Sequence, residues 1–245
     1  MSGLRIAMAV LLASAASACA QEIPSGTALP VRLNTKLDEK SATSGQPITA
    51  SIAQDVPLPS GGMIRAGSRM SGRVLQAGRK GDGSSYVRLR FDSVHSNGRD
   101  IAINTSLRAL APPRDVLDAQ MPDHSPDRGE SPANWTTTQI GGDSVYRGGG
   151  HVMHGDVVVG DPVNDGVMAV LLAVPYPGCD AGSNGRRLAL WVFSSSACGA
   201  YGFGRFDIAH AGDTNPIGEI VLQSRKNVRV YAGSGMLLIT VSSIQ

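Results

Sequence analysis

Short alternations of apolar and polar residues fill the first half of the chain. They occur at residues 29–33, 47–52, 72–75, 86–91 and 101–103. Turn signals separate them, such as Ser60-Gly61-Gly62 and Asn97-Gly98, and an Asn-Gly pair between two such runs is a strong hairpin signal. A period of two is typical of strands with one buried face. The pattern predicts an all-β fold, either an antiparallel barrel or a sandwich.

One seven-residue phrase recurs: an apolar residue, any residue, a small residue, Gly, Ser or Thr, any residue, then Leu or Met. It occupies residues 23–29, 64–70 and 230–236. The central glycine suits the positive φ of a tight turn, and the residues after it alternate as a strand does. Because the phrase lies near both ends of the chain, we expect the last strand to return to the first within one antiparallel system.

The second half is more varied. Residues 111–134 contain five prolines and few apolar residues, which indicates a linker or long loop. We therefore divide the mature chain into a barrel segment (21–110), this Pro-rich segment, and a β-rich region (135–245) whose last strand could complete the barrel. Apolar runs in that region predict strands at 157–159, 188–193, 217–222, 228–230 and 237–239. The run 167–174 could be a strand or one short buried helix.

The N-terminus has the pattern of a secretory signal: Arg5, an apolar run over 6–12, and small residues ending Ala18-Cys19-Ala20. Cleavage after Ala20 predicts an exported protein, periplasmic or extracellular. The alternative is a lipoprotein anchored through Cys19, because Ala16-Ser17-Ala18-Cys19 loosely resembles a lipobox. No later run approaches ~20 apolar residues, so no transmembrane helix is expected after signal removal.

Charge and cysteine content narrow the function classes. The formal charge is +2 including Arg5, and the pairs Arg79-Lys80, Arg186-Arg187 and Arg225-Lys226 form no continuous basic stripe. We interpret them as solvated turn and edge-strand cations and expect no nucleic-acid partner.

After signal removal Cys179 and Cys198 remain. In an oxidising compartment they predict a disulfide, with two free buried thiols as the alternative.

Candidate chemistry is sparse. His151, His154 and Asp156 are weak candidates for a metal site, although on a strand the two imidazoles would point to opposite faces. His210, Asp213 and Glu219 could join such a site only through the fold. The chain contains no Gly-x-Ser-x-Gly elbow and no phosphate-binding loop, and we assign neither a catalytic residue nor a cofactor.

Four aromatic residues could form a glycan-stacking surface: Trp135, Trp191, Tyr201 and Phe203. Aromatic residues make up only 4% of the chain, which favours core packing as their role.

Residues 23–110 carry a family resemblance. Its pieces are 23–30, Gly45-Gln46 followed by Ala50, Gln54-Asp55-Val56, 66–72, 91–94 and 97–99. In order and spacing they resemble the β-barrel domain of the TrbI-like family, the outer-membrane scaffold of type IV secretion and conjugation channels. Members of that family carry an inner-membrane helix and a long Pro-rich segment before the barrel, and a pore-forming helical hairpin in place of residues 111–134. The resemblance therefore implies a barrel fold and a structural role more than a channel.

These features predict a non-enzymatic exported scaffold or interaction protein of the cell envelope, with envelope proteins as possible partners. One alternative is a secreted metal-dependent hydrolase that uses His151, His154 and Asp156. Another is a glycan-binding module, which requires Trp135 or Trp191 to be exposed.

Overall fold

The computed structural model describes residues 22–173, 179, 184–209, 211 and 218–242, and over these residues the fold is all-β, as predicted. Residues 1–20, with the expected signal and Cys19, lie outside the described residues, as do His210 and Asp213. Among the described residues, no helix is long and apolar enough to cross a membrane.

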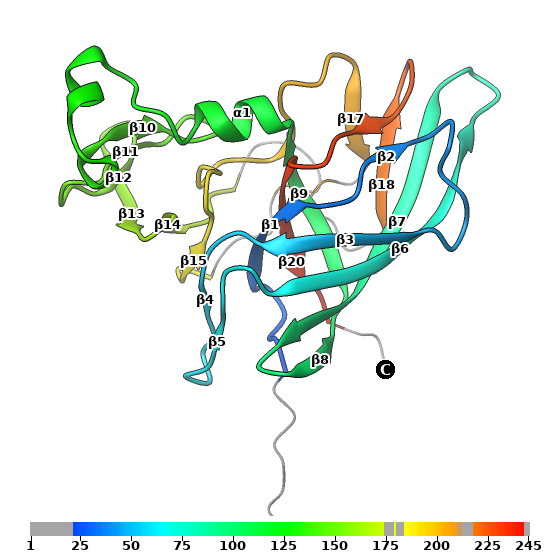
Figure 1. Ribbon diagram of the computed structural model, residues 1–245, viewed down its shortest axis with the longest axis horizontal. Helices are drawn as coiled ribbons and strands as arrows, with labels where there is room; N and C mark the ends of the chain where they lie inside the picture. The colour runs from blue at the N-terminus through cyan, green and yellow to red at the C-terminus, as the bar shows by residue number, and fades with distance from the viewer. Residues whose placement is uncertain (1–21, 174–178, 180–183, 210, 212–217, 243–245) are drawn as a thin grey trace, which may run out of the picture.

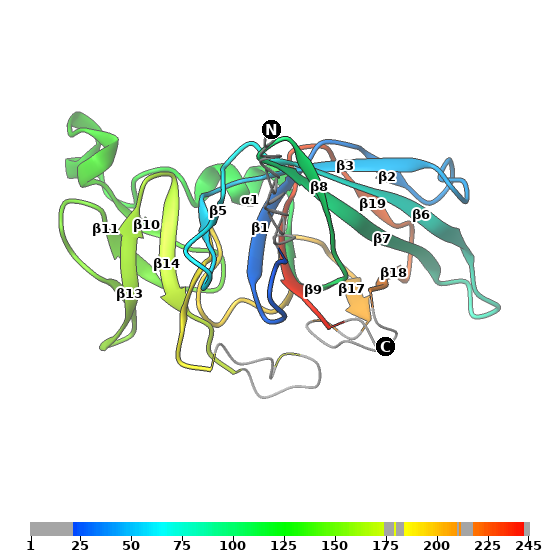
Figure 2. The same cartoon turned by 90° about the horizontal axis from the view of Figure 1, so that it is seen from below.

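A mixed sheet curls into a nearly closed barrel (Figures 1 and 2). Its order in the described residues is β16-β9-β20-β1-β3-β6-β7-β18-β17, and β8 also pairs with β7. The bounds are β1 (Ala28–Leu33), β3 (Pro47–Ile52), β6 (Arg69–Arg79), β7 (Ser85–Ser96), β8 (Arg99–Ala102), β9 (Thr105–Ala111), β16 (Gly199–Ala200), β17 (Phe206–Ala209), β18 (Ile220–Ser224) and β20 (Gly235–Thr240). Only the β16–β9 pair of this sheet is parallel in the described chain.

The recurring phrase forms the turns that start three barrel strands. Its central glycines Gly26, Gly67 and Gly233 have φ values of +80°, +84° and +89°. The strands β1, β6 and β20 begin within two residues of them. β20 pairs with β1 in antiparallel register, with Leu29 opposite Leu238, so the last strand returns to the first as expected.

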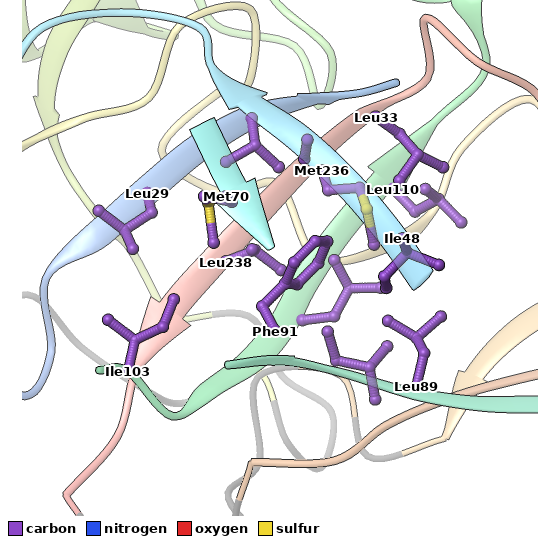
Figure 3. Close-up of a cluster of buried hydrophobic side chains, with 14 of the residues drawn as sticks. Leu29, Leu33, Ile48, Met70, Leu89, Phe91, Ile103, Leu110, Met236 and Leu238 are labelled. Atoms are coloured by element: carbon purple, nitrogen blue, oxygen red, sulfur yellow. The ribbon is translucent and has the colours of Figure 1, made fainter. Parts of the chain in front are cut away.

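The barrel interior is filled by apolar side chains. Figure 3 shows Leu29, Met70, Phe91 and Leu238 from different strands pointing toward one another, and each is at most 1% exposed. The short pairs β2 (Leu37–Asp38) with β19 (Arg229–Val230), and β4 (Val56–Pro57) with β5 (Met63–Ile64), add Leu37, Val56, Ile64 and Val230 to this core. The barrel interior is therefore a packed core, and a ligand or partner would contact the outer surface of the barrel.

A second, antiparallel sheet lies beside the barrel, and we call it the outer sheet. Its strands follow chain order: β10 (Thr136–Thr138), β11 (Ser144–Tyr146), β12 (Val152–His154), β13 (Val157–Val163), β14 (Gly166–Val170) and β15 (Arg187–Ala189). The segment before it contains α1 (Pro113–Asp118) and the 3-10 turns η1 (Ser125–Gly129) and η2 (Pro132–Asn134). Residues 167–170 belong to β14, so the helical alternative for that run is wrong.

The strand expected at 188–193 is also only partly correct, because β15 ends at Ala189. The chain turns at Trp191, whose φ of +53° lies outside the region of a strand. This turn brings the Trp191 backbone N–H against the barrel.

The outer sheet packs on the outer face of β1, β9 and β20. Met236 and Leu238 of β20 face the barrel core, whereas Leu237 and Ile239 belong to a second core. Trp191, which follows β15 of the outer sheet, lies in that second core and is 1% exposed. These barrel strands are therefore buried on both faces, which explains their nearly continuous apolar sequence.

Gln54 joins the two layers through hydrogen bonds. Its side chain is fully buried and pairs with Val167 as a strand would: Nε2 donates to the Val167 carbonyl (2.8 Å) and Oε1 accepts from the Val167 N–H (3.2 Å). Oε1 also accepts from the Trp191 N–H (2.7 Å). Gly166 must be glycine here, because a Cβ would lie 2.0 Å from Gln54 Oε1.

Arg108 of β9 supports the same layer from within the core. Its fully buried guanidinium donates to the carbonyls of Leu172 (2.6 Å), Cys179 (2.8 Å) and Ala197 (2.9 Å). Cys179 and Cys198 form the predicted disulfide, so the free-thiol alternative is wrong. The bridge and Arg108 together fix the segment that returns the chain from the outer sheet to the barrel.

Replacing Gln54 with Ala tests this joint. We expect Gln54→Ala to lower the free energy of unfolding by about 3 kcal/mol, because two N–H groups and one carbonyl lose their partner in the interior. Urea unfolding of the purified protein measures the change. The matched control is Gln76→Ala on the exposed face of β6, which should stay within about 0.5 kcal/mol of the wild type. Equal effects of the two substitutions on the free energy of unfolding would contradict the role of Gln54 in joining the two layers.

Candidate functional site

A pocket of about 410 Å³ lies where the outer sheet meets the Pro-rich segment, and we call it the Trp135 pocket. Its walls include Pro132, Trp135, Arg147, Pro162, Asn164 and Asp165. Pockets that bind small ligands commonly enclose about 300–1,000 Å³ and combine apolar walls with a few polar groups. The volume and the residue types of this pocket fit that description.

The β10–β11 ladder places the two principal side chains side by side. Thr136 pairs with Tyr146, and the ladder continues one step further because the Arg147 N–H donates to the Trp135 carbonyl (3.0 Å). Residues directly opposite in an antiparallel pair hold their side chains close together on one face. The η2 turn ends at Asn134, directly before Trp135. The Trp135 indole N–H donates to the Glu130 carbonyl (3.0 Å), which fixes the ring.

Arg147 ties the opposite wall to the sheet. Its guanidinium donates to the Gly166 carbonyl (3.0 Å) and contacts the Val163 carbonyl (3.5 Å), so it holds both ends of the β13–β14 turn. Burial lowers the pKa of Arg147, while the nearby Asp165 carboxylate raises it. An arginine remains charged at neutral pH despite such a shift. The pocket therefore has a half-buried cation beside a half-buried indole ring.

This arrangement supplies binding chemistry. The Trp135 ring offers an apolar surface for a ligand ring, and Arg147 offers N–H donors in a planar fork. Asn164 and Gln120 add amide groups that both donate and accept hydrogen bonds, and Asp165 adds an acceptor. Such a set suits a ligand with one apolar face and several hydroxyl, amide or carboxylate groups.

The predicted metal residues lie elsewhere in the outer sheet and have separate partners. His151 Nδ1 lies 2.7 Å from Asp161 Oδ1, and Asp161 also pairs with Arg187. His154 Nδ1 lies 2.8 Å from Asp143 Oδ1. Asp156 is exposed in the turn between β12 and β13. In the described part of the chain, no group of three or more His, Cys, Asp or Glu side chains is placed to hold a metal ion.

Asp143 anchors a turn through its buried carboxylate. Besides His154, it accepts a hydrogen bond from the Ser195 N–H (2.6 Å), and its side chain is fully buried. It therefore links the β10–β11 turn to the Ser-rich segment before Cys198. Glu219, named in the second metal set, forms an ion pair with Arg88 of β7.

The aromatic residues separate into two groups. Trp191 is buried, with the Arg32 guanidinium 5.2 Å from its ring centroid, and so cannot stack on a ligand. Tyr201 is packed against the second core, and Phe203 stacks on Phe206 with ring centroids 4.8 Å apart. Only Trp135 of the four lines the Trp135 pocket.

Sequence reasoning named Trp135 but missed Arg147. No local motif marks Arg147, and it meets Trp135 only through the register of β10 with β11.

Asp55, a residue of the family resemblance, closes the turn of the second phrase. Its Oδ1 accepts from the Ala66 N–H (2.8 Å), and this hydrogen bond together with Arg65 lowers the pKa of Asp55. Its role in the structure is to shape that turn.

No protein-family model matches the sequence, and a search of curated proteins finds no match to it.

Proposed function

We propose that the protein is a non-enzymatic, exported interaction protein of the cell envelope, in which the barrel is the scaffold and the outer sheet carries the recognition site. The observation that supports this most is the Trp135 pocket, which is made of binding groups held in fixed positions. The filled barrel interior leaves recognition to the outside of the molecule. The signal pattern of residues 1–20 and the disulfide suit an oxidising, extracytoplasmic compartment.

The resemblance to TrbI-like barrels is part of the same proposal. It supports a scaffold built on residues 23–110 that works together with other envelope proteins. The outer sheet would then be this chain's own means of contacting a partner, in place of the helical hairpin of those channel proteins.

Fractionation of the native host tests the envelope role. We expect the wild-type protein, followed by antibody, to elute from a sizing column in a complex larger than a monomer after mild detergent solubilisation of the envelope. Trp135→Ala should shift it to the monomer position, because the pocket loses its apolar wall. Tyr231→Ala removes an exposed aromatic ring outside the pocket and should leave the complex intact. A wild-type protein that elutes only as a monomer would contradict the proposal.

A glycan-binding module is the second candidate, because Trp135 is accessible in a pocket that also holds amide and charged groups. Sugars present an apolar ring face and surrounding hydroxyl groups, which match an indole with polar neighbours. In this case the partner in the envelope is a polysaccharide.

Co-sedimentation with purified peptidoglycan sacculi tests the glycan candidate. We expect the wild-type protein to pellet with the sacculi. Trp135→Ala should bind more weakly, by up to about tenfold, because it loses one stacking contact with the sugar. Tyr231→Ala should pellet like the wild type. Equal pelleting of the wild type and Trp135→Ala would remove the pocket as a glycan site.

A further inference from the structure

Two of the three basic pairs in the sequence meet at one end of the barrel. Arg79 and Lys80 lie at the end of β6, and Arg225 and Lys226 follow β18. Side-chain contacts join the two regions: Lys80 Nζ donates to Gln223 Oε1 (2.8 Å) and Arg79 Nη2 donates to Asn227 Oδ1 (2.5 Å). This end is opposite β8 and away from the outer sheet (Figure 1).

Further charged residues surround these pairs, and we call the whole group the cationic end. Its basic members are Lys36, Lys40, Arg79, Lys80, Arg205, Arg225, Lys226 and Arg229, and its acidic members are Asp38, Glu39, Asp82 and Asp207. The whole chain carries only +2, so this excess of positive charge leaves the remainder acidic on balance. Such an asymmetry orients a protein toward a negatively charged surface.

Most of the acidic groups are already engaged. Asp38 pairs with Arg229 (3.0 Å) and Glu39 with Arg79 (3.4 Å). Asp82 accepts hydrogen bonds from the backbone N–H and hydroxyl of Ser84.

Lys36 also pairs with Asp38 (3.7 Å), and the acidic groups leave several cations of the cationic end without an ion pair in the described part of the chain. Within the described residues, no carboxylate lies within ion-pair distance of Lys80, Arg205, Arg225 or Lys226. Their charges are therefore available to a ligand.

Two of these cations, Arg205 and Arg225, line a shallow depression. A pocket of about 430 Å³ lies between Arg205 and Arg225, with Ser224 as a polar wall and Phe206 as an apolar wall. Asp82 and Asp207 also line it, and Asp82 accepts the hydrogen bonds of Ser84 described above. The backbone joins the two sides, since the Arg225 N–H donates to the Arg205 carbonyl (3.3 Å).

We propose that the cationic end docks the protein onto the phosphate-bearing headgroups of an anionic lipid surface. Its cations come from separate turns and are spread over an exposed end of the barrel, which suits a plane of charges better than a single bound phosphate. Arg205 and Arg225 contact headgroup phosphates from the rim of the depression, and the surrounding lysines contact neighbouring headgroups. This site is separate from the Trp135 pocket and does not depend on its function.

Vesicle sedimentation tests the proposal with the disulfide-intact protein. We expect the protein to bind vesicles of phosphatidylcholine mixed with phosphatidylglycerol, and not vesicles of phosphatidylcholine alone. Binding should weaken as salt is raised, because screening shortens the reach of the field. Each cation near an anionic membrane changes the partition coefficient about fivefold, so the double change Arg225→Gln with Lys226→Gln should weaken binding about 25-fold.

The matched control is the double change Arg99→Gln with Arg186→Gln, which removes the same charge from exposed residues outside the cationic end. It should bind anionic vesicles within about twofold of the wild type, because its cations are distant from the surface. Circular dichroism melting of both variants confirms that they are folded.

Three results would overturn the proposal. One is equal weakening by the two double variants, which would indicate an effect of net charge alone. Another is release of the bound protein by millimolar inorganic phosphate at constant ionic strength, which would indicate a site for single phosphate ions. The third is tighter binding to a DNA duplex than to anionic vesicles at the same salt, which would indicate a nucleic-acid surface.

Discussion

The arrangement of this molecule depends on a buried polar joint between its two β layers. Backbone groups at the start of β14 and in the segments beside the outer sheet are buried against the barrel, and buried backbone groups need hydrogen-bond partners. Gln54 supplies them by pairing with Val167 and Trp191, and Arg108 does the same for Leu172, Cys179 and Ala197. Because unpaired buried polar groups are costly, each contact fixes one relative position of the two layers.

This fixed position has a functional consequence. The Trp135 pocket is built from the Pro-rich segment, from Trp135 and Arg147 at the ends of β10 and β11, and from the β13–β14 turn. That turn is followed directly by Gly166 and Val167 at the joint. Arg147 and Gln54 therefore hold opposite sides of the same short segment. The proposed recognition site is supported by the barrel even though no barrel strand lines it.

The sequence made the barrel predictable because its signals are local. The positive φ of Gly26, Gly67 and Gly233 and the Asn97-Gly98 hairpin follow from residue chemistry alone. The site was less predictable, because Trp135 and Arg147 meet through strand register and Trp191 turns the chain at a position that alternation had assigned to a strand. Two patterns in the sequence do indicate that β20 and β9 are covered on both faces. One is the continuous apolar run Leu237-Leu238-Ile239, and the other is the lone Arg108 within the apolar residues 107–110.

Native-state hydrogen exchange followed by mass spectrometry tests the central claim, that the barrel and the outer sheet form one cooperative unit through this joint. The account predicts that the most protected amides of β12–β14 exchange with the same opening free energy as those of β1 and β20, and that both respond equally to added urea. Exchange of the outer sheet through a separate opening of lower free energy, with the barrel still protected, would contradict it.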